Sequence, residues 1–413
     1  HAHPGLMTIV SEIGYGSIPD VVENNRLFRE KGNPLVPPYR YHQMLEETTA
    51  QVLKESGLDA IYPDLQTFCL KQQEIHSAAN KRMIEAIRSN PLIRGYCVHA
   101  LTGGDWVLGA GLLDLWRNPK RSYYGTMEAN APRYLALRVM PRNIYADQGA
   151  QIVVTGINDL DAVGGTLDVK LIDDEGNVSK GWKKPVELKS GISSLLDEAL
   201  NASEMSGAYR AVVTLADASG AVVAENTFGF DVFNDGDLQV PAGQVAVLDP
   251  ENLLKPFLDA RGISYVGFGA DTATELPVLV AANAAETDEL KAQFKALETR
   301  VKQGGTAVYL RALLRPGDAH WPNKEAGADA VYWAAQLLPQ EVLPVQAEKM
   351  HGLGLWVGVS HVVNDHPVFD GLQVNTMMGQ QYENVWSPHS LRNVGGELIV
   401  GAVTYGFHAS DWT

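Results

Sequence analysis

Cysteine is scarce in this chain: Cys69 and Cys97 are the only two among 413 residues. A fold held together by a framework of disulfides is therefore excluded. Cys69 falls on a predicted helix and Cys97 on a predicted strand, both in apolar surroundings, so we expect two buried free thiols. Residues 237–413 contain no cysteine, which excludes chemistry there that needs a cysteine nucleophile.

Positive charge is also in short supply. Lys and Arg total 33 against 49 Asp and Glu, which gives a formal net charge of -16 at pH 7. This balance argues against nucleic acid or an anionic membrane as a partner and favours a neutral or weakly charged substrate. No apolar run reaches the length of a membrane span, and no signal peptide is present.

Nucleotide-binding signatures are missing as well. The chain has neither a G-x-G-x-x-G motif nor a P-loop, and Gly352-x-Gly354 is too short a match to count. The chain begins at His1 rather than at methionine and ends directly after a predicted core strand. We interpret both ends as cuts, which leaves the localisation open.

What the chain does have is enough apolar material for several cores. With 413 residues and 45% hydrophobic content, it is predicted to hold two or three domains. Changes in pattern along the chain place the boundaries near residues 130 and 236.

Residues 1–130 alternate between predicted strand and helix. A β-branched run, Thr8–Val10, leads into Glu12, and glycines follow at once, as expected where a buried strand ends in a functional group and turns sharply. A polar loop over 24–40, helices over 42–56 and 72–89, and a second strand over 92–101 come next. A closed (β/α) barrel needs eight strands, so this region is predicted to be only part of a domain.

Two stretches of this region carry a specific resemblance. Ser11–Ser17 resembles the nucleophile motif at the seventh barrel strand of glycoside hydrolase family 2, which contains β-galactosidases, β-glucuronidases and β-mannosidases. Gly95–Leu101 resembles the eighth strand of that family. Three further stretches resemble the segment that closes the barrel in that family: Gly111–Asp114, Arg117–Lys120 and Tyr123–Tyr124. Residues 1–130 are thus similar to the carboxyl-terminal part of a glycosidase (β/α)8 barrel.

The resemblance implies a retaining, metal-independent β-glycosidase with Glu12 as the nucleophile. Retaining enzymes set two carboxyl groups about 5–5.5 Å apart, one attacking the anomeric carbon and one protonating the leaving oxygen. On the local pattern alone, Glu12 also fits a loop glutamate that solvates a strand end. The resemblance of Gly95–Leu101 to the eighth barrel strand favours the interpretation of Glu12 as catalytic.

The chain departs from the family pattern in two ways. The family takes its general acid/base from a glutamate after asparagine at the fourth strand, and no such pair precedes Glu12, because only eleven residues do. Glu23, Asp64 and Asp105 are available carboxylates, but none occupies that position. The family also usually has a tryptophan on the eighth strand, where this chain has His99.

Other candidate substrate-binding residues follow from position near strand ends. Asp105 could hold sugar hydroxyls, and Trp106 could stack on a sugar ring or cap the barrel rim. His99 fits either a satisfied core histidine or a sugar contact. Tyr15 fits either a donor to Glu12 or a residue packed under the loop.

Residues 131–236 have a different character. Short runs alternate in period two, and turn signals such as Asp173–Asn177 and Asp217–Gly220 separate them. Strands are predicted over 133–139, 151–155, 166–172, 209–215, 221–225 and 228–233. This pattern predicts a β-sandwich of immunoglobulin type, with a structural role.

Residues 237–413 return to alternation. Strands over 245–248, 263–266, 278–281 and 306–310, with helices over 252–261 and 286–302, predict an α/β open parallel sheet. Its later part, His366–Leu372, resembles the glutamine-amidotransferase-like domains appended to some glycosidases. A true glutaminase needs a cysteine nucleophile, so this domain would lack that activity. Tryptophans that could line a carbohydrate surface, or pack in a core, stand at Trp321, Trp333, Trp356 and Trp386.

Two functions from different classes remain open. The first is the carboxyl-terminal part of a retaining β-glycosidase whose acid/base glutamate lies outside this chain. The alternative is a non-catalytic carbohydrate-binding or scaffold module derived from such an enzyme. In both cases we expect a carbohydrate ligand, no cofactor or metal, no nucleic acid and no membrane, and a chain compatible with a homo-oligomer.

Overall fold

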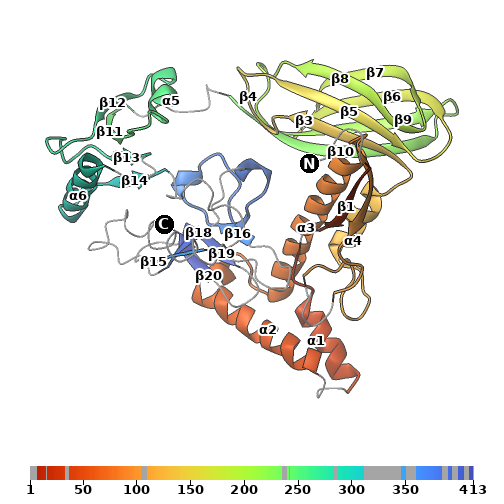
Figure 1. Ribbon diagram of the computed structural model, residues 1–413, viewed down its shortest axis with the longest axis horizontal. Coiled ribbons are helices and arrows are strands. Elements are labelled where there is room, and N and C mark those ends of the chain that lie inside the picture. The colour runs from red at the N-terminus through yellow and green to blue at the C-terminus, as the bar shows by residue number, and fades with distance from the viewer. Residues whose placement is uncertain are drawn as a thin grey trace.

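The computed structural model of this chain describes residues 7–14, 16–32, 37–103, 109–234, 240, 242–281, 287–310, 346–349, 360–383, 389–392, 399–403 and 409–412. Figure 1 shows a multidomain, β-rich arrangement. The elements of the amino-terminal region are β1 (Thr8–Ile13), α1 (Val21–Glu30), α2 (Pro37–Glu55), η1 (Leu58–Ala60), α3 (Leu65–Arg88), β2 (Ile93–Val98) and α4 (Arg121–Ala129).

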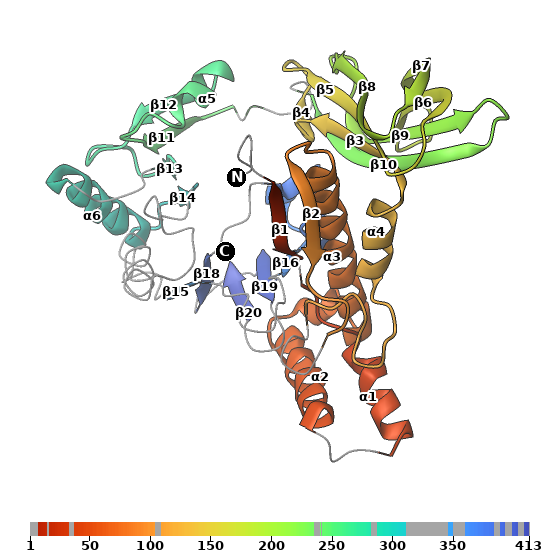
Figure 2. The same ribbon diagram turned by 45° about the vertical axis from the view of Figure 1, so that its right-hand side comes forward.

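Strands β1 and β2 pair in parallel and form a two-stranded sheet. Figure 2 shows them side by side against α3. Ile13, Tyr96 and Val98 pack with Ile84 of α3 and Tyr134 in one apolar cluster. The opposite face of this small sheet is open within the described part of the chain, because Ile9 is 59% exposed.

The helices begin where the sequence offers caps. The Asp20 carboxylate accepts from the Glu23 amide at 3.0 Å and starts α1. The Asp64 carboxylate accepts from the Thr67 amide at 2.7 Å and starts α3. The predicted helices over 42–56 and 72–89 are confirmed as α2 and α3, although both start earlier than the apolar stripe indicated.

Two expectations for this region were wrong. The segment 24–40 is not one polar loop, because α1, which starts at the Asp20 cap, runs to Glu30, and α2 begins at Pro37. Cys97 is a free thiol as expected, but it is exposed, whereas Cys69 is buried. Alternate strand residues face opposite sides, and Tyr96 and Val98 take the packed side of β2, so Cys97 faces the open one.

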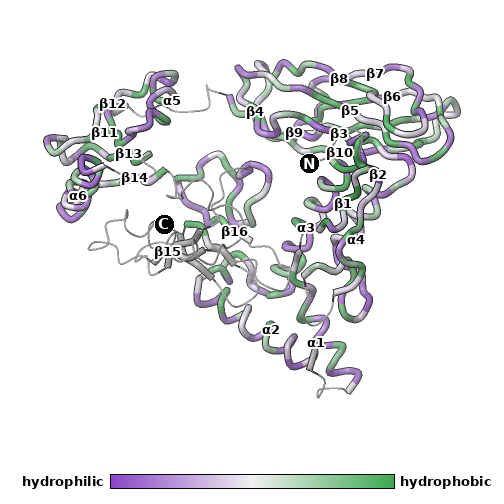
Figure 3. The backbone as a smooth tube through the Cα atoms, viewed as in Figure 1, coloured by the Kyte–Doolittle hydropathy of each residue, from purple (hydrophilic) through white to green (hydrophobic). Residues whose placement is uncertain are grey.

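The second region forms two sheets that share one apolar core. Its strands are β3 (Arg133–Met140), β4 (Asn143–Tyr145), β5 (Ala150–Asn158), β6 (Val163–Asp173), β7 (Val178–Leu188), β8 (Gly191–Leu200), β9 (Gly207–Asp217) and β10 (Val222–Phe233). One sheet has the order β4-β10-β9-β6-β7 and the other β3-β5-β8. Hydrophobic and hydrophilic residues alternate along them in Figure 3, so one side of each sheet supplies the core. Strands β4, β7 and β8 were not predicted.

The third region contains two sheets of different kinds. The parallel sheet β12-β11-β13-β14 has the predicted strands and helices: β11 (Gln244–Leu248), α5 (Lys255–Ala260), β12 (Ser264–Gly267), β13 (Val278–Val280), α6 (Asp288–Lys302) and β14 (Ala307–Tyr309). The other sheet is antiparallel, with β15 (Gln346–Lys349), β16 (Ser360–Val363), β17 (Thr376–Met377), β18 (His389–Arg392), β19 (Val400–Val403) and β20 (Ala409–Trp412). The expectation of a parallel sheet throughout 237–413 was therefore wrong. The later strands pair antiparallel, and antiparallel strands can follow one another without the crossover helices that a parallel sheet needs.

The antiparallel sheet packs on the amino-terminal helices. Val362 and Met377 share an apolar cluster with Leu45 of α2 and Phe68 of α3. The Met377 amide donates to the Tyr62 hydroxyl at 3.0 Å. The end of the chain thereby completes a core whose other members come from its first seventy residues.

Helix α3 is joined to the second region by a buried carboxylate. Glu85 is 4% exposed, and its Oε1 accepts from the Tyr134 hydroxyl at 2.6 Å and from the Asn226 amide group at 3.0 Å. Burial beside this carboxylate raises the pKa of the Tyr134 hydroxyl, which keeps it a donor. The Glu85 side chain thus links helix α3 to one strand of each sheet, β3 through Tyr134 and β10 through Asn226.

We predict that Glu85→Ala lowers the free energy of unfolding by about 1–3 kcal/mol, because it leaves two buried donors without an acceptor. Glu85→Gln is the matched control, since its amide oxygen can still accept from both donors. Thermal unfolding followed by circular dichroism measures the difference. Equal losses in the two variants would show that the charge matters rather than the acceptor.

Candidate active site

Glu12 lies at an irregular point near the carboxyl end of β1. Val10 is opposite Tyr96, and Ile13 is opposite Val98, so β1 takes three steps where β2 takes two. An extra residue of this kind is a β-bulge, which turns a side chain away from the regular alternation. The Glu12 side chain is 49% exposed and can be reached from solvent.

His99 follows β2 directly and meets the end of β1. Its backbone N–H donates to the Ile13 carbonyl oxygen at 2.8 Å. Its ring Nδ1 lies 3.1 Å from Oε1 of Glu12, and its side chain is 32% exposed. Two of the residues that sequence reasoning singled out, one on each strand, are therefore in contact.

The close approach of the two strand ends depends on a glycine. A Cβ atom at Gly14 would lie 2.4 Å from the His99 carbonyl oxygen, far inside van der Waals contact. Only a residue without a side chain allows the backbone after Glu12 to pass His99 at this distance.

The other sequence-predicted site residues fall outside the described part of the chain. These are Tyr15, Asp105 and Trp106, and the same holds for Trp321, Trp333, Trp356 and Trp386. Their roles remain predictions.

The alternative carboxylates have local partners. Glu23 pairs with Arg26, with Nη2 and Oε1 2.6 Å apart, and this side-chain hydrogen bond lowers the pKa of Glu23. Asp64 caps α3, and the hydrogen bond from the Thr67 amide lowers its pKa. Both carboxylates serve helix ends, as the general pattern of acidic residues at helix amino termini explains.

Polar side chains of α3 bind the loop after Glu12, and sequence reasoning missed these contacts. Gln72 Oε1 accepts from the Ile18 amide at 2.7 Å, and Gln73 Nε2 donates to the Ile18 carbonyl oxygen at 3.2 Å. Ser17 Oγ lies 2.8 Å from His76 Nδ1. The available signal was the polar spacing itself, because residues 72, 76 and 80 recur at the four-residue interval of one helix face.

A buried serine, histidine and asparagine form a chain of polar contacts here. Ser17 contacts His76, and His76 Nε2 lies 3.2 Å from Asn80 Nδ2. The order suggests an activated nucleophile, but Ser17 and His76 are both 0% exposed, so no substrate reaches them. Burial, together with the nearby Lys120 charge, lowers the pKa of His76 to about 2. We interpret these residues as anchors for the loop.

Lys120 closes the same junction from another segment. Its Nζ donates to the carbonyl oxygens of Ser17 and Gly109, both at 2.8 Å. Burial lowers the pKa of Lys120 to about 7, although the Asp114 carboxylate acts in the opposite direction. Lys120, at the start of α4, thus joins the loop after β1 to Gly109 through one side chain.

Within the part of the chain that the structure describes, no group of three or more His, Cys, Asp or Glu side chains could hold a metal ion. Among the same residues, no helix is long and apolar enough to cross a membrane.

No protein-family model matches the chain, and no curated protein matches its sequence. Solved structures do resemble it. A β-D-mannosidase from Dictyoglomus thermophilum is 20% identical with a TM-score of 0.40, over 58% of this chain and 29% of that protein. An exo-chitosanase from Amycolatopsis orientalis is 22% identical with a TM-score of 0.30, over 39% and 18%. A β-glucuronidase from glycoside hydrolase family 2 is 13% identical with a TM-score of 0.20, over 40% and 22%.

These neighbours are all glycoside hydrolases by their names, and this chain spans less than a third of the length of each. At such TM-scores and coverage, the likeness assigns no residue a role.

We predict that Gly14→Ala destabilises the junction of β1 and β2 by about 1–3 kcal/mol, because its Cβ collides with the His99 carbonyl. Gly95→Ala on β2 is the matched control, since its Cβ would meet Ile9 at an ordinary 4.0 Å. Urea unfolding of both variants gives the comparison. A Gly14→Ala variant as stable as Gly95→Ala would show that the two strand ends are not held this closely.

A second prediction concerns Lys120 and pH. Its pKa is about 7 when folded, and an unfolded lysine has a pKa of about 10.4. Between these values the unfolded chain binds more protons, so this residue makes the free energy of unfolding rise with pH. The difference in unfolding free energy between the parent and Lys120→Met should therefore grow in favour of the parent from pH 7 to pH 10. A difference that stays constant across these pH values would contradict the buried, weakly basic lysine.

Proposed function

We propose that this chain is the carboxyl-terminal part of a retaining β-glycosidase of glycoside hydrolase family 2, with Glu12 as the nucleophile. The observation that carries the proposal is the position of Glu12. It stands on a bulge near the carboxyl end of β1, beside the carboxyl end of the parallel strand β2, with His99 against it. In (β/α) barrels the catalytic residues come from this end of several strands.

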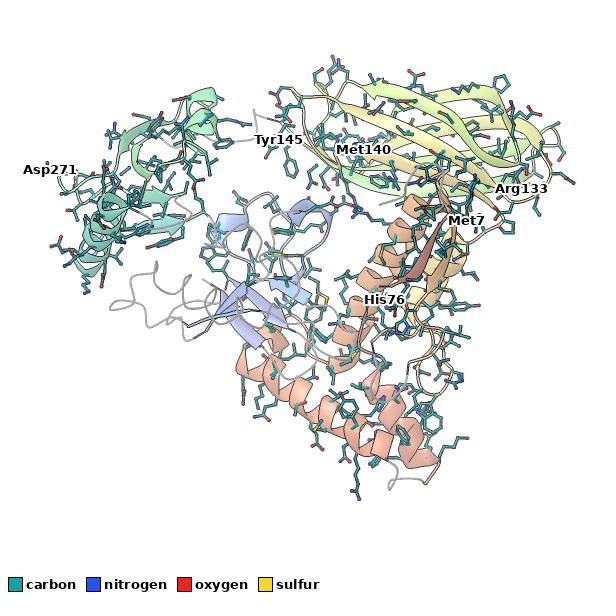
Figure 4. The ribbon with its side chains drawn as sticks, viewed as in Figure 1. Met7, His76, Arg133, Met140, Tyr145 and Asp271 are labelled. Carbon is teal, nitrogen blue, oxygen red and sulfur yellow. The ribbon has the colours of Figure 1, made fainter. Side chains whose placement is uncertain are left out.

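The open face of β1 and β2 supports an incomplete barrel. Ile9 is 59% exposed, and Met7, labelled at the start of β1 in Figure 4, is 76% exposed. Exposed apolar side chains on the same strand as a candidate catalytic group are explained if further strands cover them. We propose that β1 and β2 are the seventh and eighth strands of a barrel whose other strands lie outside this chain.

The chemistry assigns one half of the reaction to this chain. The Glu12 carboxylate would attack the anomeric carbon, and the bond from that carbon to the leaving oxygen would break. The leaving oxygen takes a proton from a second carboxylic acid, and we place that glutamate outside these residues because no Asn-Glu pair precedes Glu12. Water then hydrolyses the glycosyl-enzyme, with the second glutamate acting as base.

The remaining assignments extend this proposal. Tyr15, Asp105 and Trp106 would bind the sugar around Glu12. Residues 131–236 would be an immunoglobulin-like sandwich, and residues 237–413 an amidotransferase-like domain without a catalytic cysteine. The ligand would be a carbohydrate, with no cofactor, nucleic acid or membrane involved, and the protein could form homo-oligomers.

The test is covalent labelling of a longer protein that contains this chain. A 2-deoxy-2-fluoro glycoside with an activated leaving group reacts without help from the acid, so it isolates the nucleophile. A panel of mannoside, glucuronide, glucoside and galactoside probes tests which sugar is accepted. We expect the added sugar mass on the peptide containing Ser11-Glu12-Ile13, and none in Glu12→Gln, because an amide does not attack the anomeric carbon.

A label on another carboxylate would show that Glu12 is not the nucleophile. Absence of any label, with the protein demonstrably folded, would favour a non-catalytic carbohydrate-binding module. The 413 residues alone should hydrolyse no natural glycoside, since they supply one carboxyl group of the pair.

A further inference from the structure

The end of β1 makes several contacts with one residue, His99. The His99 N–H bonds the Ile13 carbonyl at 2.8 Å, the His99 carbonyl lies against Gly14, and the ring meets Glu12. Three consecutive residues of β1 and its exit thus contact a single residue of the neighbouring strand end. The His99 backbone is fixed by these contacts, so its ring approaches Glu12 from a defined direction.

Such support matters for Glu12, because its side chain is half-exposed. Its side chain is 49% exposed, and an exposed glutamate samples several rotamers, so holding it in one of them costs conformational entropy. A hydrogen bond to one carboxylate oxygen restricts that sampling. The bulge alone turns the side chain but does not hold its outer torsions.

The 3.1 Å contact also specifies the protonation of the ring. A carboxylate only accepts hydrogen bonds, so Nδ1 must carry the proton for this contact to be attractive. If the proton were on Nε2 alone, the lone pair of Nδ1 would face Oε1 of Glu12. Of the two neutral tautomers, the geometry therefore selects the one with hydrogen on Nδ1.

We propose that His99 is a positioning residue for Glu12. Its Nδ1–H donates to Oε1 and leaves the other carboxylate oxygen free to act as the nucleophile. This inference rests on the proposed glycosidase function for its catalytic meaning, but the contact itself can be tested without activity.

The first experiment uses the 413-residue chain. Nitrogen-15 spectra of the histidine rings at pH 8 distinguish the two neutral tautomers, and the spectrum of His99→Gln assigns the His99 signals. We expect the Nδ1–H tautomer for His99 in the parent and a shift toward Nε2–H in Glu12→Ala. The buried His76 serves as an internal control, because its signals should stay in place if the variant is folded.

A parent chain with His99 in the Nε2–H form, or a tautomer unaffected by Glu12→Ala, would overturn the proposal. Neither result bears on whether the longer protein hydrolyses glycosides. Failure of the inference and failure of the proposed function are therefore separate outcomes.

The second experiment measures labelling rates in the longer protein. Asparagine can place its amide nitrogen near the position of Nδ1, whereas glutamine mimics Nε2. His99→Asn should keep the labelling rate near that of the parent, while His99→Gln and His99→Ala should lose about 10- to 100-fold in the rate constant, with little change in probe affinity. Equal losses in the asparagine and glutamine variants, or a loss confined to affinity, would contradict positioning through Nδ1.

Discussion

The buried polar side chains of helix α3 are the constraint on which the arrangement of this chain depends. Five of them are nearly or fully buried: Gln72, Gln73, His76, Asn80 and Glu85. A buried polar group without a partner costs about 1–3 kcal/mol, so each of them must be satisfied. Because α3 is rigid, the segments that supply the partners are held at set positions along it.

Those partners come from segments far apart in the sequence. Gln72 binds the Ile18 amide on one side and the Ser360 hydroxyl, at 3.0 Å, on the other. Gln73 also accepts from the Arg121 amide at 3.1 Å, at the start of α4. Glu85 reaches the second region. The loop after Glu12 is therefore coupled to the antiparallel sheet near the end of the chain through one glutamine.

This construction explains how a half-exposed carboxylate can still have a defined place. Glu12 lies at an open edge, where its side chain is 49% exposed. The rigidity comes from the layer beneath, where Ser17 and Ile18 are buried and bound by α3 and Lys120. The proposed nucleophile thus stands on a well-packed support, while its other side is exposed.

Sequence reasoning recovered the elements whose pattern is local. The apolar stripes gave α2, α3 and α6, and period-two alternation gave β3, β5, β6, β9 and β10. It missed α1, because Asn24 and Asn25 interrupt the buried face that Val21 and Phe28 share, and it missed β7, whose lysines obscure the alternation. Cys97 was placed inside because its neighbours are apolar, whereas its face of the sheet is decided by what packs there.

The sequence by itself determined that Glu12 lies near the end of a strand, that glycines follow it and that His99 lies near the end of a second strand, because strand and turn signals lie within a few adjacent residues. Only the tertiary structure decided that these two side chains meet, since that depends on the parallel register of β1 and β2 and on the extra residue before Ile13. The same holds for Gln72, His76 and Lys120. A buried polar residue has the same local signature whatever its partner, and the partner is chosen through space.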